Sequence, residues 1–221
     1  MPPDDPVAVR LRGFGPLGLA AILLVLAGNL VVAPLSALLV LAWAWRSRTL
    51  WAELGLARPR SWIASFAIGI ALGVALKLVM KALVMPLLGA PPVNAAYHYL
   101  AGNESALPGM IVTVVFVAGV GEEILFRGFL FERLGRLLGT GAAAKTAIVL
   151  LTAALFGLAH LPEQGLPGAG QGAVVGLVLG AIFAVSGRLW VPIIAHAAFD
   201  LVAVALIYWG VETEVATFVF G

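Results

Sequence analysis

The chain has 221 residues, of which 62% are hydrophobic and 11% are charged, and its formal net charge is +2. Soluble domains are about 45–50% apolar and about 25% charged, so this composition excludes an ordinary soluble domain and indicates an integral membrane protein. The small net charge gives no reason to expect nucleic-acid binding. The lack of cysteine excludes disulfides, thiolate metal sites and cysteine nucleophiles.

The apolar segments are long and lack the alternating pattern of barrel strands. They predict an all-α fold, a polytopic membrane helix bundle of about six transmembrane helices. We expect one integral-membrane domain over residues 1–221, with N-terminal spans in residues 1–107 and the functional core in residues 108–209.

The first apolar segment, residues 16–45, carries no charge over thirty residues. A membrane helix needs about 20 residues to cross a hydrocarbon core of ~30 Å. A split at Gly28-Asn29 or at Pro34 would leave two halves that are too short to span comfortably. We therefore predict one long helix, kinked or tilted; a hairpin would instead move the N-terminus to the other side of the membrane.

The later spans are predicted at residues 62–88, 108–138, 142–160, 171–186 and 189–209, with a Pro/Gly-rich loop at residues 161–170. A small residue at every fourth position of 171–186, from Gly172 to Ala184, predicts close packing of a neighbouring helix. Lys77 and Lys81 lie one turn apart in the far half of their span. We expect them to snorkel to the outer surface, with a role in substrate binding as the alternative.

Lysine and arginine are distributed unevenly among the loops. Residues 46–60 and 127–145 carry four each and position 188 carries one, whereas 89–107, 161–170 and 210–221 carry none. The positive-inside rule places the first group in the cytoplasm, which fits six spans entered from outside. Arg10 and Arg12 do not fit this topology.

The run of residues 121–127 contains adjacent carboxylates behind an uncharged apolar stretch, residues 108–120. An ionisable group inside a membrane costs roughly 2.5–3.5 kcal/mol on insertion scales, so such groups usually have a function. At about 100° per residue, Glu123 and Arg127 lie on one helix face and can pair, whereas Glu122 points about 140° away from Arg127. Glu122 is therefore the predicted reactive carboxylate, a general base. The alternative is that both carboxylates lie outside the bilayer at a helix end.

Two histidines fall inside spans, His160 and His196, and Asp200 follows His196 by one turn. If Thr140 is the pivot of a helical hairpin, His160 comes level with Glu122 to within about one turn at about 1.5 Å per residue. Glu122, His160 and His196 could hold zinc with an open water position. Equally, Glu122 and His160 could activate a water without metal, with His196 donating to the oxyanion. Asp200 would orient His196.

Three short motifs occur in order on successive helices: Glu122-Glu123-x-x-x-Arg127, Phe156-x-x-x-His160 and His196-x-x-x-Asp200. Over residues 108–209 the chain resembles the CPBP (Abi) intramembrane proteases, which are relatives of the CAAX prenyl endopeptidases. The resemblance implies an intramembrane endopeptidase that cleaves near the cytoplasmic membrane face. It implies Glu122 as base, His160 as its partner, His196 and Asp200 completing the site, and Glu123 and Arg127 in support.

The resemblance further implies a peptide or membrane-protein substrate, prenylated or not, within the lipid bilayer of the bacterial cytoplasmic membrane. The resemblance leaves open whether zinc is required, because the family is called metalloprotease and a metal-free glutamate mechanism is also proposed for it. It implies no organic cofactor. The alternative reading is a transporter or proton relay, or an inactive scaffold. Ionisable residues that cluster at one depth, rather than along a path across the bilayer, favour the peptidase.

Overall fold

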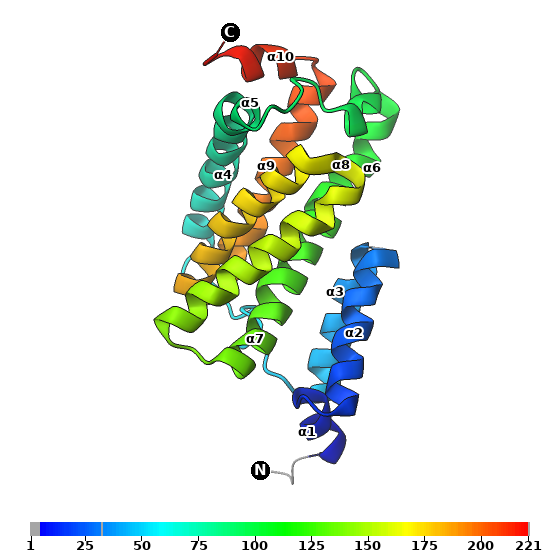
Figure 1. Cartoon of the computed structure of the whole chain (residues 1–221), viewed down its shortest axis with the longest axis vertical. Helices are drawn as coiled ribbons and strands as arrows, with labels where there is room; N and C mark the ends of the chain where they lie inside the picture. The colour runs from blue at the N-terminus through cyan, green and yellow to red at the C-terminus, as the bar shows by residue number, and fades with distance from the viewer. Residues whose placement is uncertain (1–4, 32, 221) are drawn as a thin grey trace.

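The computed structural model describes residues 5–31 and 33–220, and within them it contains helices and no strand (Figure 1). The predicted all-α fold is confirmed. In chain order the elements are α1 (Pro6–Arg12), α2 (Pro16–Val31), α3 (Ala33–Ser47), α4 (Trp62–Val79), η1 (Met80–Val84), α5 (Met85–Leu87), η2 (Ala95–Leu100), η3 (Glu104–Ala106), α6 (Leu107–Val112), η4 (Thr113–Glu122), η5 (Ile124–Phe129), α7 (Leu130–Leu138), α8 (Ala142–Ser186), α9 (Trp190–Tyr208) and α10 (Glu212–Thr217). Of these, η1, η4 and η5 are π-helices, and η2 and η3 are 3-10 helices.

Four helical segments of the described chain are long and apolar enough to cross a membrane: Trp62–Leu87, Glu104–Leu138, Ala142–Ser186 and Trp190–Tyr208. A fifth candidate is the bent pair of α1 and α2, with 59° between its two parts. The segment Ala142–Ser186 reverses its direction halfway and supplies two antiparallel arms (Figure 1). The chain is therefore an integral membrane protein, and the predicted number of about six spans is approximate.

The reversal within α8 occurs at a single residue, Gly165, whose φ of 64° and ψ of −167° are not helical. Glycine reaches positive φ without the steric cost of a Cβ. The expectation of a ten-residue loop at 161–170 is therefore wrong, because helix continues up to Gly165 and resumes directly after it.

Small residues allow the two arms of α8 to pack closely, as predicted. A Cβ on Gly157 would lie 2.6 Å from the carbonyl oxygen of Ala169, and a Cβ on Gly176 would lie 2.9 Å from Cα of Ala153. The arms therefore approach each other backbone to backbone.

The prediction of one long helix over residues 16–45 is wrong, because α2 and α3 form an antiparallel hairpin (Figure 1). A Cβ on Gly28 would lie 2.8 Å from Cδ1 of Leu39 and 3.4 Å from the backbone nitrogen of Ser36, so the two helices pack closely at this turn. Pro34 lies in the first turn of α3, where proline is tolerated. With 16 and 15 residues, the two helices rise only about 24 and 22 Å, less than a hydrocarbon core of ~30 Å.

The hairpin brings the N-terminal arginines to the same end of the bundle as the other basic loops. Arg46 at the end of α3 pairs with Asp5 over 2.7 Å, and Arg133 of α7 donates to the carbonyl oxygen of Arg12 over 2.8 Å. With the hairpin, Arg10 and Arg12 lie on the same side as the other basic loops. They therefore agree with the positive-inside rule, which they contradicted in the six-span topology. The segments at this basic end are α1, the end of α3, the loop before α4, α7, the start of α8 and the turn before α9 (Figure 1). They carry Arg10, Arg12, Arg46, Arg48, Arg58, Arg60, Arg133, Arg136, Lys145 and Arg188.

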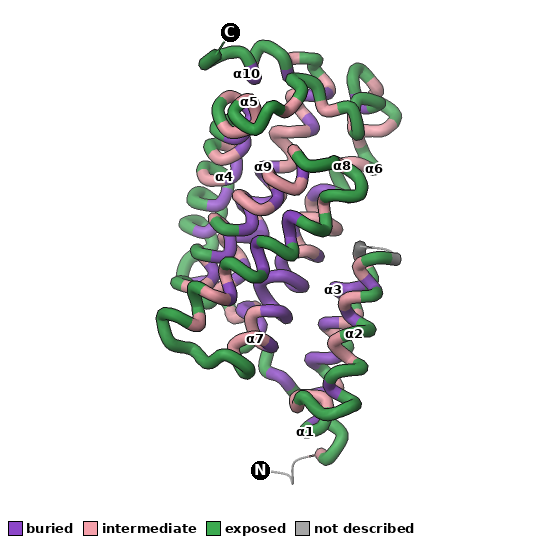
Figure 2. Tube along the Cα trace, viewed as in Figure 1, coloured by how far each residue is buried: buried purple, intermediate pink, exposed green. Residues whose placement is uncertain are grey.

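Helix α9 packs in the middle of the bundle, where buried residues are concentrated (Figure 2). On its α4 side, a Cβ on Gly73 would lie 2.2 Å from the carbonyl oxygen of Ala195. On its η4 side, a Cβ on Gly119 would lie 2.9 Å from Cβ of Ala197. Glycines on both neighbours thus hold the His196 turn of α9 tightly between them.

The helix that carries Glu122 and Glu123 is π-helical on both sides of Glu123, over η4 and η5. A π-helix bonds residue i to residue i+5, is rare, and occurs frequently at functional sites. The angles of 100° per residue used on the sequence therefore do not describe this segment, although the pairing that they predicted between Glu123 and Arg127 is present.

Candidate active site

The predicted ion pair between Glu123 and Arg127 is confirmed and completely buried. Oε1 of Glu123 accepts from Nη1 of Arg127 over 2.8 Å, and their side chains are 0% and 1% exposed. Arg127 also donates to the carbonyl oxygen of Gly176 over 3.3 Å, and its guanidinium lies 4.6 Å from the ring centre of Phe156. The pair therefore joins its own helix to both arms of α8.

His196 lies among three carboxylates. Its Nδ1 lies 2.8 Å from Oε1 of Glu123, and its Nε2 lies 3.9 Å from Oε2 of Glu122 and 3.5 Å from Oδ2 of Asp200. The hydrogen bond at Nδ1, which fixes the ring, is made by Glu123. Asp200 lies instead on the Nε2 side, so the orienting role expected of it is carried mainly by Glu123.

Glu122 differs from Glu123 in being available to a ligand. Its side chain is 20% exposed, and its Oε2 is buried without a hydrogen-bond partner among the described residues. The predicted division between one paired and one free carboxylate therefore agrees with the geometry. The catalytic role of Glu122 stays a prediction.

His160 is held from the protein side through Nδ1, which lies 2.8 Å from the carbonyl oxygen of Phe156. The ring of Phe156 lies between the two histidines, at 4.6 Å from His160 and 5.7 Å from His196 between ring centres. Phe156, the first residue of the Phe-x-x-x-His motif, thus contacts both histidine rings and the guanidinium of Arg127.

Four of the six predicted site residues line one cavity of about 310 Å³. Glu122, His160, His196 and Asp200 all line it, whereas Glu123 and Arg127 lie behind its wall. The structure therefore brings Glu122, His160 and His196 together in one cavity, as predicted.

Tyr97 of η2 lines the same cavity and was not among the residues selected from the sequence. Burial, together with the nearby carboxylates of Glu163, Asp200 and Glu122, raises the pKa of Tyr97 to about 12. Its hydroxyl is therefore protonated at neutral pH and can donate a hydrogen bond. No sequence signal marks this tyrosine, because it stands in a segment that we expected to be a solvated loop.

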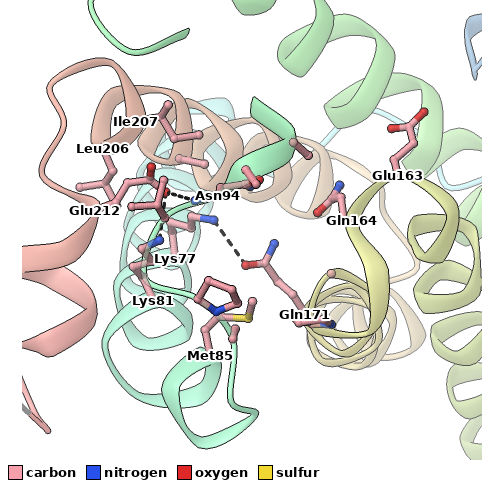
Figure 3. Close-up of a pocket in the computed structure, with 18 residues that line it drawn as sticks. Lys77, Lys81, Met85, Asn94, Glu163, Gln164, Gln171, Leu206, Ile207 and Glu212 are labelled. Atoms are coloured by element: carbon pink, nitrogen blue, oxygen red, sulfur yellow. Dashed lines mark hydrogen bonds and ion pairs between the residues drawn. The ribbon is translucent and has the colours of Figure 1, made fainter. Parts of the chain in front are cut away.

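The expectation that Lys77 and Lys81 snorkel to the surface is wrong, because both are buried, with 7% and 8% exposure. Nζ of Lys77 donates to Oε1 of Gln171 over 3.4 Å, and Nζ of Lys81 lies 3.0 Å from Oε1 of Glu212 (Figure 3). These residues line a second cavity of about 310 Å³. Lys77 and Gln171 also line the first cavity, so the two adjoin at these side chains.

The predicted zinc ligands are present but not gathered around a point. Both histidines use Nδ1 within the protein, which leaves Nε2 for a metal or for proton transfer. Within residues 5–31 and 33–220, however, no group of three His, Asp or Glu side chains is arranged to hold a metal ion. In this conformation the residues do not fit zinc, and a metal requirement stays a prediction.

Both cavities extend away from the basic end of the bundle. The first is lined by Tyr97, Leu100 and Met110, and the second by Ala90, Asn94 and Glu212; these residues belong to the segments from α5 to α6 and to α10, which lie at the other end (Figure 1). Under the positive-inside rule this end is extracytoplasmic. Two expectations from the sequence therefore conflict. A cytoplasmic basic end places the cavity on the extracytoplasmic side, whereas cleavage near the cytoplasmic face requires the cavity on the cytoplasmic side.

Comparison with known proteins agrees with the three motifs. The family model described as type II CAAX prenyl endopeptidase Rce1-like matches residues 104–202, the range that holds Glu122, His160 and His196. No curated protein and no solved structure matches the chain. Residues 104–202, which carry all three motifs, therefore match the CAAX prenyl endopeptidase family.

Proposed function

We propose that this protein is an intramembrane endopeptidase that hydrolyses a peptide bond with a water molecule activated by Glu122 and His160. The observation that carries the proposal is the free carboxylate of Glu122. Its side chain lines the cavity and is 20% exposed, whereas the adjacent Glu123 is fully buried and its Oε1 is bonded to both Arg127 and His196. The Rce1-like match supports the protease class.

The two activating residues have complementary roles. Because Nδ1 of His160 faces a carbonyl oxygen, it carries the proton, and Nε2 can accept a hydrogen bond from the attacking water. Glu122 then takes a proton from that water as its oxygen attacks the carbonyl carbon. As the tetrahedral intermediate collapses, the same proton passes from Glu122 to the leaving amine.

The negative oxygen of the intermediate needs hydrogen-bond donors. His196 has carboxylate acceptors beside both ring nitrogens, and a ring that donates from both is the imidazolium form. We assign the donation to His196 Nε2, with the hydroxyl of Tyr97, which lines the same cavity, as a second donor.

The substrate that we propose is a peptide or membrane protein, with a prenylated C-terminal CAAX segment as the first candidate because of the family match. The substrate would reach Glu122 from the end of the bundle that carries residues 89–107, since the cavity extends there. The membrane that we propose is the bacterial cytoplasmic membrane.

A test of this function uses the purified protein in detergent and a peptide farnesylated at the cysteine of its CAAX sequence. Mass spectrometry should detect the released C-terminal tripeptide with wild type, and none with Glu122→Gln. Cleavage by Glu122→Gln at the wild-type rate would assign the activity to a contaminant or to another residue.

A second candidate, a proton relay, is favoured by one observation. Buried polar groups continue from Asp200 past Lys77 to the pair of Lys81 and Glu212, so they are not confined to the single depth expected from the sequence. In liposomes with an imposed pH gradient, a relay would dissipate the gradient, and Glu122→Gln would abolish that flux. The peptidase proposal predicts no flux above that of empty liposomes.

A further inference from the structure

Two buried lysines of one helix face the same cavity in different electrostatic states. Lys81 is neutralised by Glu212, whose Oε1 also accepts from the backbone nitrogen of Asn94 over 3.1 Å. Lys77 has no such partner: within the described residues, no carboxylate oxygen lies within 4.0 Å of its Nζ. Figure 3 shows Lys81 turned toward Glu212 and Lys77 turned across the cavity toward Gln171.

The groups in direct contact with Nζ of Lys77 are electrically neutral, and the carboxylates of Asp200 and Glu212 act on it only from beyond ion-pair distance. The contacting groups are the amide oxygen of Gln171 at 3.4 Å and the ring of Phe199, whose centre lies 4.6 Å from Nζ. Removing an ammonium from water costs several kcal/mol, and neutral neighbours repay only part of that cost. A cation kept buried in this way is prepared for an anionic ligand.

Lys77 lies close enough to the candidate active site for its ligand to be a part of the substrate. Lys77 and Gln171 lie where the two cavities adjoin, and the first of these cavities contains Glu122. Because Oε1 of Gln171 accepts from Lys77, the amide nitrogen of Gln171 is left to donate. An ammonium and an amide donor side by side match the two oxygens of a carboxylate.

We propose that Lys77 and Gln171 bind the free α-carboxylate of the substrate, so that the enzyme cleaves close to a peptide's C-terminus. This rests on the peptidase function proposed above. A carboxylate suits the site better than a phosphate dianion, because Glu163, Asp200 and Glu122 line the same space and one lysine cannot balance a second negative charge.

The experiment compares two farnesylated CAAX peptides of identical sequence, one a C-terminal acid and one a C-terminal amide. Wild type should prefer the acid in kcat/KM by about 10- to 100-fold, the range for a hydrogen bond to a charged group. Lys77→Met should remove the preference by raising KM for the acid alone. Lys77→Arg should keep part of it, and Gln171→Leu should reduce it independently.

The matched control is the double variant Lys81→Met/Glu212→Gln, which removes a buried lysine from the same cavity without leaving an unpaired charge. Its acid-to-amide ratio should equal that of wild type. An active Lys77→Met enzyme that keeps the wild-type ratio overturns the proposal. If no peptide is cleaved at all, the peptidase function fails, and the carboxylate site is then tested by measuring peptide binding. Wild type must bind the acid more tightly than the amide, and Lys77→Met must lose this difference in affinity.

Discussion

Oε1 of Glu123 lies 2.8 Å from Nδ1 of His196, across the interface between the η4–η5 helix and α9. The same oxygen accepts from Arg127 over 2.8 Å, so a single carboxylate oxygen fixes both a buried arginine and the ring that faces the cavity. Glu123 thus positions the site without lining it, while Glu122 lines it without being fixed.

Substituting each carboxylate by its amide should separate these roles. Glu122→Gln should lower kcat by at least about 10²-fold, the lower range for acid–base catalysis, and leave the unfolding temperature in detergent nearly unchanged. Glu123→Gln leaves Arg127 buried without its counter-charge, which typically costs about 3–5 kcal/mol, so it should lower the unfolding temperature strongly. Glu122→Gln with wild-type activity would contradict the assignment.

The two histidines should be needed for cleavage whether or not a metal is added. His160→Ala and His196→Ala should each reduce kcat at least about 10²-fold. Because no step proposed here uses a metal, treatment with a chelator should leave the wild-type rate unchanged. Loss of activity with the chelator and its return with zinc would support a ligand set of Glu122, His160 and His196, which must then rearrange to bind it.

Tyr97→Phe removes only the hydroxyl from the cavity wall. If that hydroxyl donates to the developing oxyanion, kcat should fall about 10²- to 10³-fold with little change in KM or in unfolding temperature. Tyr99→Phe is the control, since Tyr99 is 56% exposed on the same short helix. Equal activities of the two variants would exclude Tyr97 from the reaction.

Gly73 should tolerate no side chain, because its Cβ would lie 2.2 Å from a backbone oxygen of α9. Gly73→Ala should therefore destabilise the protein by about 1–3 kcal/mol, the usual cost of overpacking, and displace the turn that carries His196. The matched control is Gly135→Ala in α7, where a Cβ would meet nothing within 4 Å. There alanine should raise stability by about 0.5–1 kcal/mol, as measured by thermal unfolding.

Single introduced cysteines should report topology without background, because the native chain has none. If the basic end is cytoplasmic, an impermeant thiol reagent on intact cells should label Ser105→Cys and spare Val9→Cys and Thr140→Cys. The reverse pattern would place the cavity on the cytoplasmic side. Labelling of Val9→Cys together with Ser105→Cys would contradict the α2–α3 hairpin.

Local spacing was enough to predict the pair of Glu123 and Arg127, because residues four apart on a helix are neighbours whatever surrounds them. Close packing on the second arm of α8 could likewise be predicted, since small residues at every fourth position line one face, although the sequence did not name the neighbouring helix. Motif order then grouped Glu122, His160 and His196 in one cavity.

Features that depend on how helices face one another could not be predicted. Glu123 and His196 are 73 residues apart, and spacing along the chain does not show which carboxylate α9 meets. Lys77 points inward because its face of α4 packs on α9, a relation that hydropathy does not contain. The α2–α3 hairpin, kept as the alternative to one long helix, could not be chosen for a similar reason, because an uncharged run has the same hydropathy whether it continues or folds back.

The buried cluster around Glu123 also constrains how the chain is synthesised. Glu123 and Arg127 neutralise each other within one helix, so that helix can enter the bilayer as an ion pair as soon as it leaves the ribosome. His196 follows much later, on α9, and until it arrives the cavity lacks the ring that Glu123 is placed to hold. On the proposed mechanism, a chain that has not yet added α9 lacks the His196 donor, so it should not hydrolyse peptides before the bundle has closed.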